Sequence, residues 1–190
     1  MLEDLNKITE LKSIKDKDLF YEAIFNREDI LNIFRELKDN KLFSFDQLID
    51  ITAIDYPSKD NRFELIYIFL SMKKNKRIIL KTSIKENDSI DSIIQIFSAS
   101  DWYERECYDL FGIKFNNHPD LRRIMTDYNF EGHPLRKDFP LTGHTEVRYD
   151  DVEKKVVYEP VKLTQEYRDF DYTSPWEGMP KGIDDHSEQE

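Results

Sequence analysis

The chain has 190 residues, a length that favours one compact domain, with or without an appendage, over two full domains. Acidic residues outnumber basic residues 39 to 28, and the net charge of −11 argues against nucleic-acid binding and against electrostatic attachment to anionic lipid. Residues 1–100 carry 16 basic and 18 acidic side chains, a balance of −2, so residues 101–190 carry the remaining −9. All five glycines and six of the seven prolines also fall at or after Gly112.

Several classes of protein are excluded by what the sequence lacks. It contains no glycine-rich nucleotide-binding motif. The longest apolar run, Leu65–Leu70, is far shorter than a membrane-spanning helix. The single cysteine, Cys107, excludes an intrachain disulfide and a metal site built from cysteines alone. The acidic start does not resemble a targeting peptide, and we expect a soluble chain in a reducing compartment.

The first elements follow from apolar spacing. Asp18–Phe25 is rich in aromatic and β-branched residues and predicts a strand. Asn26 can cap a helix that runs to about Lys38, because four apolar residues then recur at helical spacing: Ile30, Ile33, Phe34 and Leu37. Phe43–Tyr56 mixes a helical turn with a strand expected near Asp50–Ile54.

A hairpin comes next, formed by Arg62–Ser71 and Lys76–Ile84 around a short polar turn. Asp88 or Ser89 is then expected to cap a short helix, whose inward residues would be Ile90, Ile93, Ile94 and Phe97. This order of elements predicts an α+β fold. It would have a small mixed or antiparallel sheet with helices packed on one face, followed by a long extended C-terminal segment.

A further helix is expected to begin at Asp101, with Glu104 completing a capping box, and to end before Gly112 in a C′ position. Cys107 lies on its apolar stripe, which favours a buried thiol over a nucleophile. Arg105 and Asp109 are expected to form an i,i+4 ion pair on the opposite side.

After Phe115 the pattern changes, because residues 116–190 show no sustained helical stripe. They show one possible hairpin, Glu146–Tyr149 with Val156–Tyr158. Aromatic residues are spread through the stretch, so we expect it to pack on a surface that belongs largely to another protein. The chain would then comprise an α/β domain (1–115), an extended partner-wrapping segment (116–177) and an acidic solvated tail (178–190).

Two chemical interpretations compete with structural ones. The acidic residues around Asp101–Asp109 could perform acid/base catalysis, or could belong to a partly buried ion network on a capped helix. His118 and His133 could bind metal, but both precede proline in loops, where a turn-anchoring role is sufficient. The basic pairs Arg122-Arg123 and Arg136-Lys137 suit a carboxylate-bearing protein surface.

Long ordered motifs then carry a family resemblance. Asp101–Phe115 followed by His118–Leu141 resembles the 30-kilodalton subunit family of respiratory complex I, the C subunit of NADH-quinone oxidoreductase. The similarity continues through Glu146–Asp151 and Leu163–Phe170, and family-like pieces precede it at Phe45–Pro57. It covers roughly residues 43–177, and the family signature maps onto Glu104, Arg105, Glu106, Asp109, Phe111 and Gly112.

The resemblance implies a structural subunit in the peripheral arm of a proton-pumping NADH:quinone oxidoreductase. Its partners would be chiefly the 49-kilodalton D subunit, and also the B and I subunits. It would hold no catalytic, cofactor or metal site of its own, with FMN, Fe–S clusters and quinone in partner subunits. It would lie peripherally on the inner membrane, without inserting, on the cytoplasmic side in bacteria or the matrix side in mitochondria.

Residues expected to contact partners include charged or polar groups and aromatic anchors: His118, Asp120, Arg122, Arg123, Arg136, Lys137, Phe170, Tyr172 and Trp176. One rival interpretation places the same module in a membrane-bound hydrogenase or in a dehydrogenase complex that uses another donor. Another, of a different class, is a free-standing metal-dependent hydrolase built on Glu104, Glu106, His118 and His133.

Overall fold

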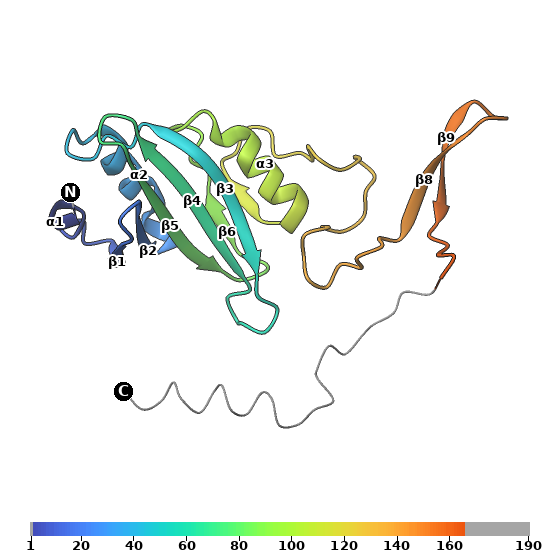
Figure 1. Ribbon diagram of the computed structural model, residues 1–190, viewed down its shortest axis with the longest axis horizontal. Helices are drawn as coiled ribbons and strands as arrows, with labels where there is room; N and C mark the ends of the chain where they lie inside the picture. Colours follow the sequence, from blue (N-terminus) through green and yellow to red (C-terminus); the bar gives the residue numbers. More distant parts are fainter. Residues whose placement is uncertain (1, 166–190) are drawn as a thin grey trace, which may run out of the picture. The chain divides into compact units, whose positions relative to one another are not determined.

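A computed structural model describes residues 2–165, which form two units, one ending at Gly143 and the other beginning at His144. The first unit is built around a five-stranded sheet (Figure 1). Its strands are β1 (Leu11–Asp16), β2 (Phe20–Phe25), β3 (Gln47–Asp55), β4 (Phe63–Ser71) and β5 (Lys76–Ile84). The spatial order is β1-β2-β5-β4-β3, and every neighbouring pair is antiparallel except β2 and β5.

The helices pack on one face of this sheet, as the sequence predicts (Figure 1). The main ones are α2 (Ile30–Asp39) and α3 (Ser100–Phe111), accompanied by the short α1 (Leu2–Leu5) and a 3₁₀ turn, η1 (Arg27–Asp29). Two short parallel strands, β6 (Ser89–Asp91) and β7 (Lys114–Asn116), flank α3 in the sequence. The α+β fold is confirmed.

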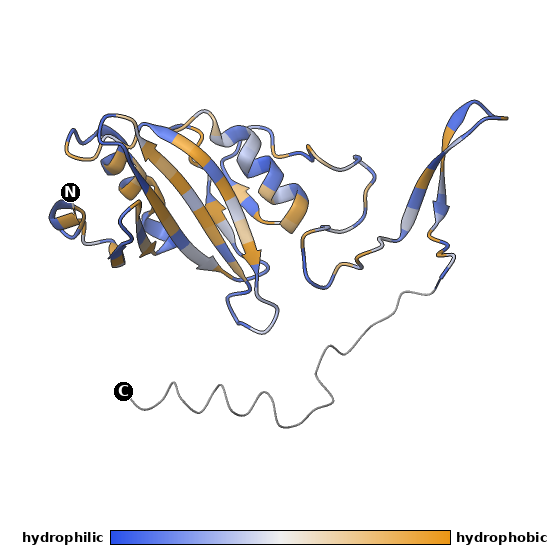
Figure 2. Ribbon diagram, in the orientation of Figure 1, coloured by the Kyte–Doolittle hydropathy of each residue, from blue (hydrophilic) through white to orange (hydrophobic). Residues whose placement is uncertain are grey.

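Strict alternation in β4 explains why this face is the core. Its odd-numbered residues from Phe63 to Ser71 are buried, and its even-numbered residues are only partly covered. Phe34 of α2 lies edge-on to Tyr67 and Phe69, with ring centroids 5.0 and 4.9 Å apart. Figure 2 shows the hydrophobic residues concentrated in β3, β4 and β5. The other face carries an ion pair between Lys81 and Glu22, whose charged atoms are 2.7 Å apart.

Two local predictions are wrong. Residues 89–97 form no helix: Ile90 lies in β6, and the chain then continues in turns. The apolar residues recur at helical spacing because β6 buries some of them and the turns after it bury the others. Asn26 makes no side-chain capping bond; its Oδ1 atom accepts a hydrogen bond from Lys12 Nζ at 3.0 Å instead. The strand expected near residues 50–54 is confirmed, and β3 extends it at its start to Gln47. The edge strand β1 has no counterpart among the predicted elements.

The second unit contains the hairpin of β8 (Thr145–Asp150) and β9 (Lys155–Pro160), which confirms the strand pairing expected there. The expected boundaries at residues 115/116 and 177/178 stay predictions, and the second of them lies outside the described residues. No helix within residues 2–165 is long and apolar enough to cross a membrane.

The hydroxyl of Tyr67 gives a test of the core. The ring is fully buried, and its oxygen has no hydrogen-bond partner among the described residues. A buried unpaired hydroxyl destabilises the folded state, so Tyr67→Phe should raise the free energy of unfolding by about 1 kcal/mol in urea denaturation. Tyr67→Ala should lower it by about 4 kcal/mol, because the ring is lost from the core. A clear loss of stability in Tyr67→Phe would contradict the unpaired hydroxyl.

Candidate functional site

Helix α3 is the element on which the candidate site is built. It begins at Ser100 without the predicted capping box, since no side chain caps its N-terminus. It ends at Gly112, whose φ of 78° is left-handed, as the sequence predicts. A Cβ atom on Gly112 would lie 2.4 Å from Arg136 Nη2 and 2.6 Å from His133 Nε2. The left-handed backbone favours glycine here, and a larger residue would in addition displace the side chains of Arg136 and His133.

The carboxylate of Asp109 binds the segment that follows β7. Its Oδ2 atom accepts the backbone N–H groups of Ile124, Met125 and Thr126 at 3.0, 2.7 and 2.8 Å. Its Oδ1 atom accepts the Thr126 hydroxyl at 2.5 Å and the Arg123 guanidinium at 2.6 Å. Burial alone would raise the pKa of Asp109, but these hydrogen bonds outweigh it and hold the pKa well below its ordinary value. The carboxylate is therefore fully buried and charged.

Arg105 binds the same stretch through its carbonyl groups. Its Nε and Nη2 atoms donate to the carbonyl oxygens of Arg122 and Arg123 at 3.2 and 3.3 Å. The predicted Arg105–Asp109 ion pair is therefore wrong. Both side chains instead satisfy backbone groups of a loop that has no regular partner strand.

The C-terminal end of α3 is covered by residues 133–136. His133 Nδ1 lies 2.8 Å from the carbonyl oxygen of Asp109, Leu135 N donates to Leu110 O at 3.1 Å, and Arg136 Nε donates to Phe111 O at 2.6 Å. These are carbonyls that a helix end leaves without partners. Because a carbonyl only accepts, Nδ1 of His133 carries the hydrogen; burial also lowers the pKa of His133.

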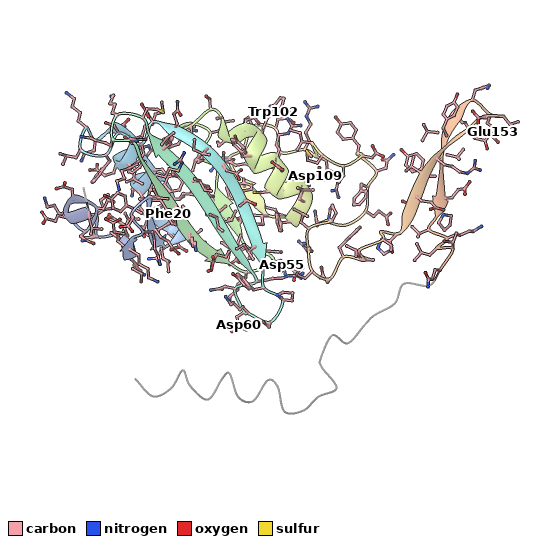
Figure 3. All side chains as sticks on the ribbon, viewed as in Figure 1. Phe20, Asp55, Asp60, Trp102, Asp109 and Glu153 are labelled. Atoms are coloured by element: carbon pink, nitrogen blue, oxygen red, sulfur yellow. The ribbon has the colours of Figure 1, made fainter. Side chains whose placement is uncertain are left out.

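An ion network then joins the next residues to the sheet. At the end of β3, Asp55 accepts Arg62 Nε and Nη2 at 2.7 and 2.9 Å, and its Oδ2 atom also accepts Lys137 N at 2.8 Å (Figure 3). The Arg62 guanidinium reaches Asp138 at 2.9 Å, and Glu86 pairs with Arg136 at 2.8 Å. The bond from Arg62 is the main cause that lowers the pKa of Asp55. We call residues 122–138, held by α3 and this network, the anchored segment.

Glu104 and His118 form a buried pair of ionisable groups beside the start of α3. Glu104 Oε1 accepts the backbone N–H of Ile93 at 2.8 Å, in place of its predicted capping bond. His118 Nε2 lies 3.3 Å from Asp101 Oδ1 and 3.9 Å from Glu104 Oε2. Burial raises the pKa of Glu104 above its ordinary value.

Apart from Glu106, the signature residues thus make structural contacts inside the chain. Phe111 packs edge-on to Phe63. Cys107 is buried and donates its Sγ–H to Ile51 O at 3.3 Å, and burial raises the pKa of this thiol. Glu106, another charged signature residue, lines a surface groove. Within residues 2–165, no three or more His, Cys, Asp or Glu side chains are arranged to hold a metal ion.

The predicted partner-binding residues are found in different environments. The His118 side chain is buried, and Arg123 and Arg136 are occupied by Asp109 and Glu86. Asp120 and Arg122 form an exposed ion pair at 2.9 Å. Lys137 is held through its backbone. Their contact with a partner stays a prediction, and Phe170, Tyr172 and Trp176 lie outside the described residues.

The second unit presents an amphipathic hairpin. Register places Val147 opposite Tyr158 and Tyr149 opposite Val156, so these four side chains share one face. All four are more than half exposed. The other face carries charges, with Arg148 within 2.7 Å of Glu159. An isolated two-stranded hairpin is marginally stable in water, so this apolar face is a candidate binding surface. The sequence predicts the strands but not which residues form this face.

The anchored segment depends on Asp109, which gives a direct test. Asp109→Asn removes the charge that pairs with Arg123 and places an amide donor among five hydrogen-bond donors. We expect it to lower the free energy of unfolding by about 3 kcal/mol. Amide exchange at residues 124–126 should accelerate in the same variant. The matched control Asp120→Asn removes only an exposed pair and should change neither quantity; equal effects of the two variants would contradict the assignment.

Glu104 predicts a pH dependence of the opposite sign to that of a carboxylate with a lowered pKa. Because its pKa is raised, the folded chain binds this proton more tightly than the unfolded chain does. Its contribution to stability is therefore greatest at low pH and is lost as pH rises from the ordinary value of 4.5 through the raised pKa. Glu104→Gln keeps an acceptor for Ile93 and removes the charge.

The free energy of unfolding of Glu104→Gln should therefore exceed that of the original chain at pH 7, and the two should converge toward low pH. Denaturation curves across this range measure the difference. Repeating the comparison in a His118→Gln background separates Glu104 from the imidazole beside it. A difference that does not vary with pH would refute the raised pKa.

Comparison with known proteins agrees with the resemblance in the sequence. Residues 23–145 match the family described as respiratory-chain NADH dehydrogenase, 30 Kd subunit. The chain is 54% identical over 153 residues to the C subunit of NADH-quinone oxidoreductase from Hyphomonas neptunium, covering 80% of this chain and 76% of that one. It is 56% identical over 151 residues to the protein of the same name in Rhodobacter capsulatus, with the same two coverages, 80% and 76%.

A solved structure shares the fold. A chain from the membrane-bound sulfane sulfur reductase, an archaeal respiratory membrane complex, superposes with a TM-score of 0.64 at 25% identity, covering 73% of this chain and 82% of that chain. The family match spans more than half of the sequence, and the curated relatives exceed 50% identity. The chain therefore belongs to the family of the 30-kilodalton subunit of respiratory-chain NADH dehydrogenase.

Proposed function

We propose that this chain is a structural subunit of the peripheral arm of a proton-pumping NADH:quinone oxidoreductase, where it braces the quinone-reducing module. The observation that carries the proposal is the combination of family membership with the exposed apolar side chains on one face of the β8–β9 hairpin. The 49-kilodalton D subunit would be its main partner, with the B and I subunits nearby. The chain would sit peripherally at the inner membrane, on the cytoplasmic or matrix side.

The proposed role requires no active site within this chain. FMN, Fe–S clusters and quinone would be held by partner subunits. The charged signature residues support this division of labour, since Glu104, Arg105 and Asp109 each bind backbone groups of the chain. Side chains that make such contacts stabilise the fold of the chain, and a bracing subunit acts through its folded surface.

A second candidate is the same module in a complex that uses another electron donor or acceptor. The structural likeness to a chain of the archaeal sulfane sulfur reductase favours keeping it. Native purification separates the two candidates: co-purification of flavin-bearing subunits that oxidise NADH supports the first, and their absence from an intact complex supports the second.

The hairpin face gives the direct test of bracing. Tyr149→Ser combined with Tyr158→Ser removes two exposed aromatic side chains and should lower the yield of assembled arm about tenfold. The matched control, Glu146→Ser with Lys155→Ser, changes the opposite face and should stay within about twofold of the original yield. The melting temperature of the isolated chain should be unchanged in both, because the core of the first unit does not involve these residues. Equal yields from the two double variants would refute a role of this face in assembly.

A further inference from the structure

A groove lies beside the start of α3, with a volume of about 510 Å³. Its walls come from two separate segments. One supplies Asp101, Trp102, Tyr103 and Glu106 of α3, after Ser98 and Ala99, and the other supplies Ile124 and Met125 of the anchored segment. The groove is therefore assembled by the same contacts that attach residues 122–126 to α3.

The apolar side chains of this groove are large and open to solvent. Trp102 is 67% exposed and Met125 is 65% exposed. Figure 3 shows Trp102 near the start of α3, on the side away from the sheet. Tryptophan and methionine are enriched in protein interfaces, and tryptophan is among the residues that most often dominate binding energy.

Both residues stand on backbone that is held by hydrogen bonds. Trp102 stands on a helix, and Met125 is held through its backbone N–H, which donates to Asp109 Oδ2 at 2.7 Å. Ile124 is held in the same way at 3.0 Å. Because this backbone is already ordered, the ordering cost of binding is confined to the side chains.

The two charged residues that line the groove are both acidic. Asp101 and Glu106 line it, and no lysine or arginine of the described residues does. The Asp101 carboxylate lies beside the His118 imidazole, but Glu106 forms no ion pair with a described side chain. A bound segment that carries a cation next to an apolar side chain would complement both the carboxylates and the apolar side chains of the groove. Anionic lipid headgroups would be repelled by the same carboxylates.

We propose that this groove binds a segment of a partner subunit in which an apolar side chain stands next to a lysine or arginine. The apolar side chain packs between Trp102 and Met125, and the cation pairs with Glu106. The proposal rests on the proposed function, because it takes the chain to be part of a multisubunit complex. It adds a second contact surface, distinct from the hairpin face.

Site-specific photo-crosslinking in the assembled complex tests the contact. A benzophenone side chain is placed at Trp102 or Met125, at Met72 in the β4–β5 turn as a negative control, and at Val147 on the hairpin face. We expect positions 102 and 125 to crosslink one peptide of a partner that contains adjoining apolar and basic residues. Position 72 should give no such product.

Incorporation measured by competition tests the energetics. A tagged variant is co-expressed with the original chain, and their ratio in the purified complex is divided by their ratio in the cell extract. Trp102→Ala should reduce incorporation about 30-fold, as expected for a central aromatic anchor, whereas Met72→Ala should not. Glu106→Lys should reduce it about tenfold more than Glu106→Gln at low salt, with the gap narrowing at high salt, and Asp60→Lys should have no effect.

The outcomes separate this proposal from the proposed function. Crosslinks at Val147 but none at positions 102 and 125 overturn the groove proposal and leave the bracing role intact. Crosslinks from the groove to lipid, to a second copy of this chain or to a peptide without a basic residue also overturn it. A chain that fails to co-purify with any respiratory subunit overturns the proposed function instead.

Discussion

The structure of the first unit beyond β7 depends on one buried carboxylate. A charge removed from water is tolerated only when hydrogen bonds replace its hydration, and Asp109 obtains five, from three backbone N–H groups, one hydroxyl and one guanidinium. Each donor belongs to residues 123–126, so desolvation of Asp109 is compensated only while that stretch is in place. The anchored segment and α3 are consequently ordered together.

Two carboxylates five positions apart on α3 have opposite electrostatic environments. The pKa of Asp109 is lowered by its donors, while the pKa of Glu104 is raised by burial. Such divergence is characteristic of acid/base pairs in active sites, but it also arises in structural networks. Here Asp109 binds residues 123–126 and Glu104 binds Ile93, two different segments of the chain. The opposite pKa shifts of Glu104 and Asp109 therefore arise from two structural contacts that one helix makes.

Local signals predict those elements whose stability is local. Alternation specifies β4 and β5, glycine specifies the end of α3 at residue 112, and paired β-branched and aromatic residues specify the β8–β9 hairpin. The wrong predictions have a common physical origin in distant partners. Residues 89–97 imitate a helix because β6, which pairs with β7, and the following turns bury apolar residues at spacings that resemble helical ones. The spacing of Arg105 and Asp109 suggests a mutual pair, although each binds a loop that sequence spacing cannot locate.

The sequence predicts that the extended C-terminal part becomes ordered by packing on another protein. In the structure, the anchored segment and the hairpin differ in this respect. The anchored segment obtains its order from the chain itself, through Asp109, Arg105 and the Asp55–Arg62 network. Its shape therefore exists before any partner arrives, and assembly need not compensate the entropy of forming it. The hairpin is different, because the apolar side chains on one of its faces are more than half exposed and a two-stranded hairpin is marginally stable without further packing. A bracing subunit with these two surfaces would bind first through the preformed surface on α3 and then through its hairpin. Substitutions in the groove should therefore lower the association rate constant, and substitutions in the hairpin should mainly raise the dissociation rate constant.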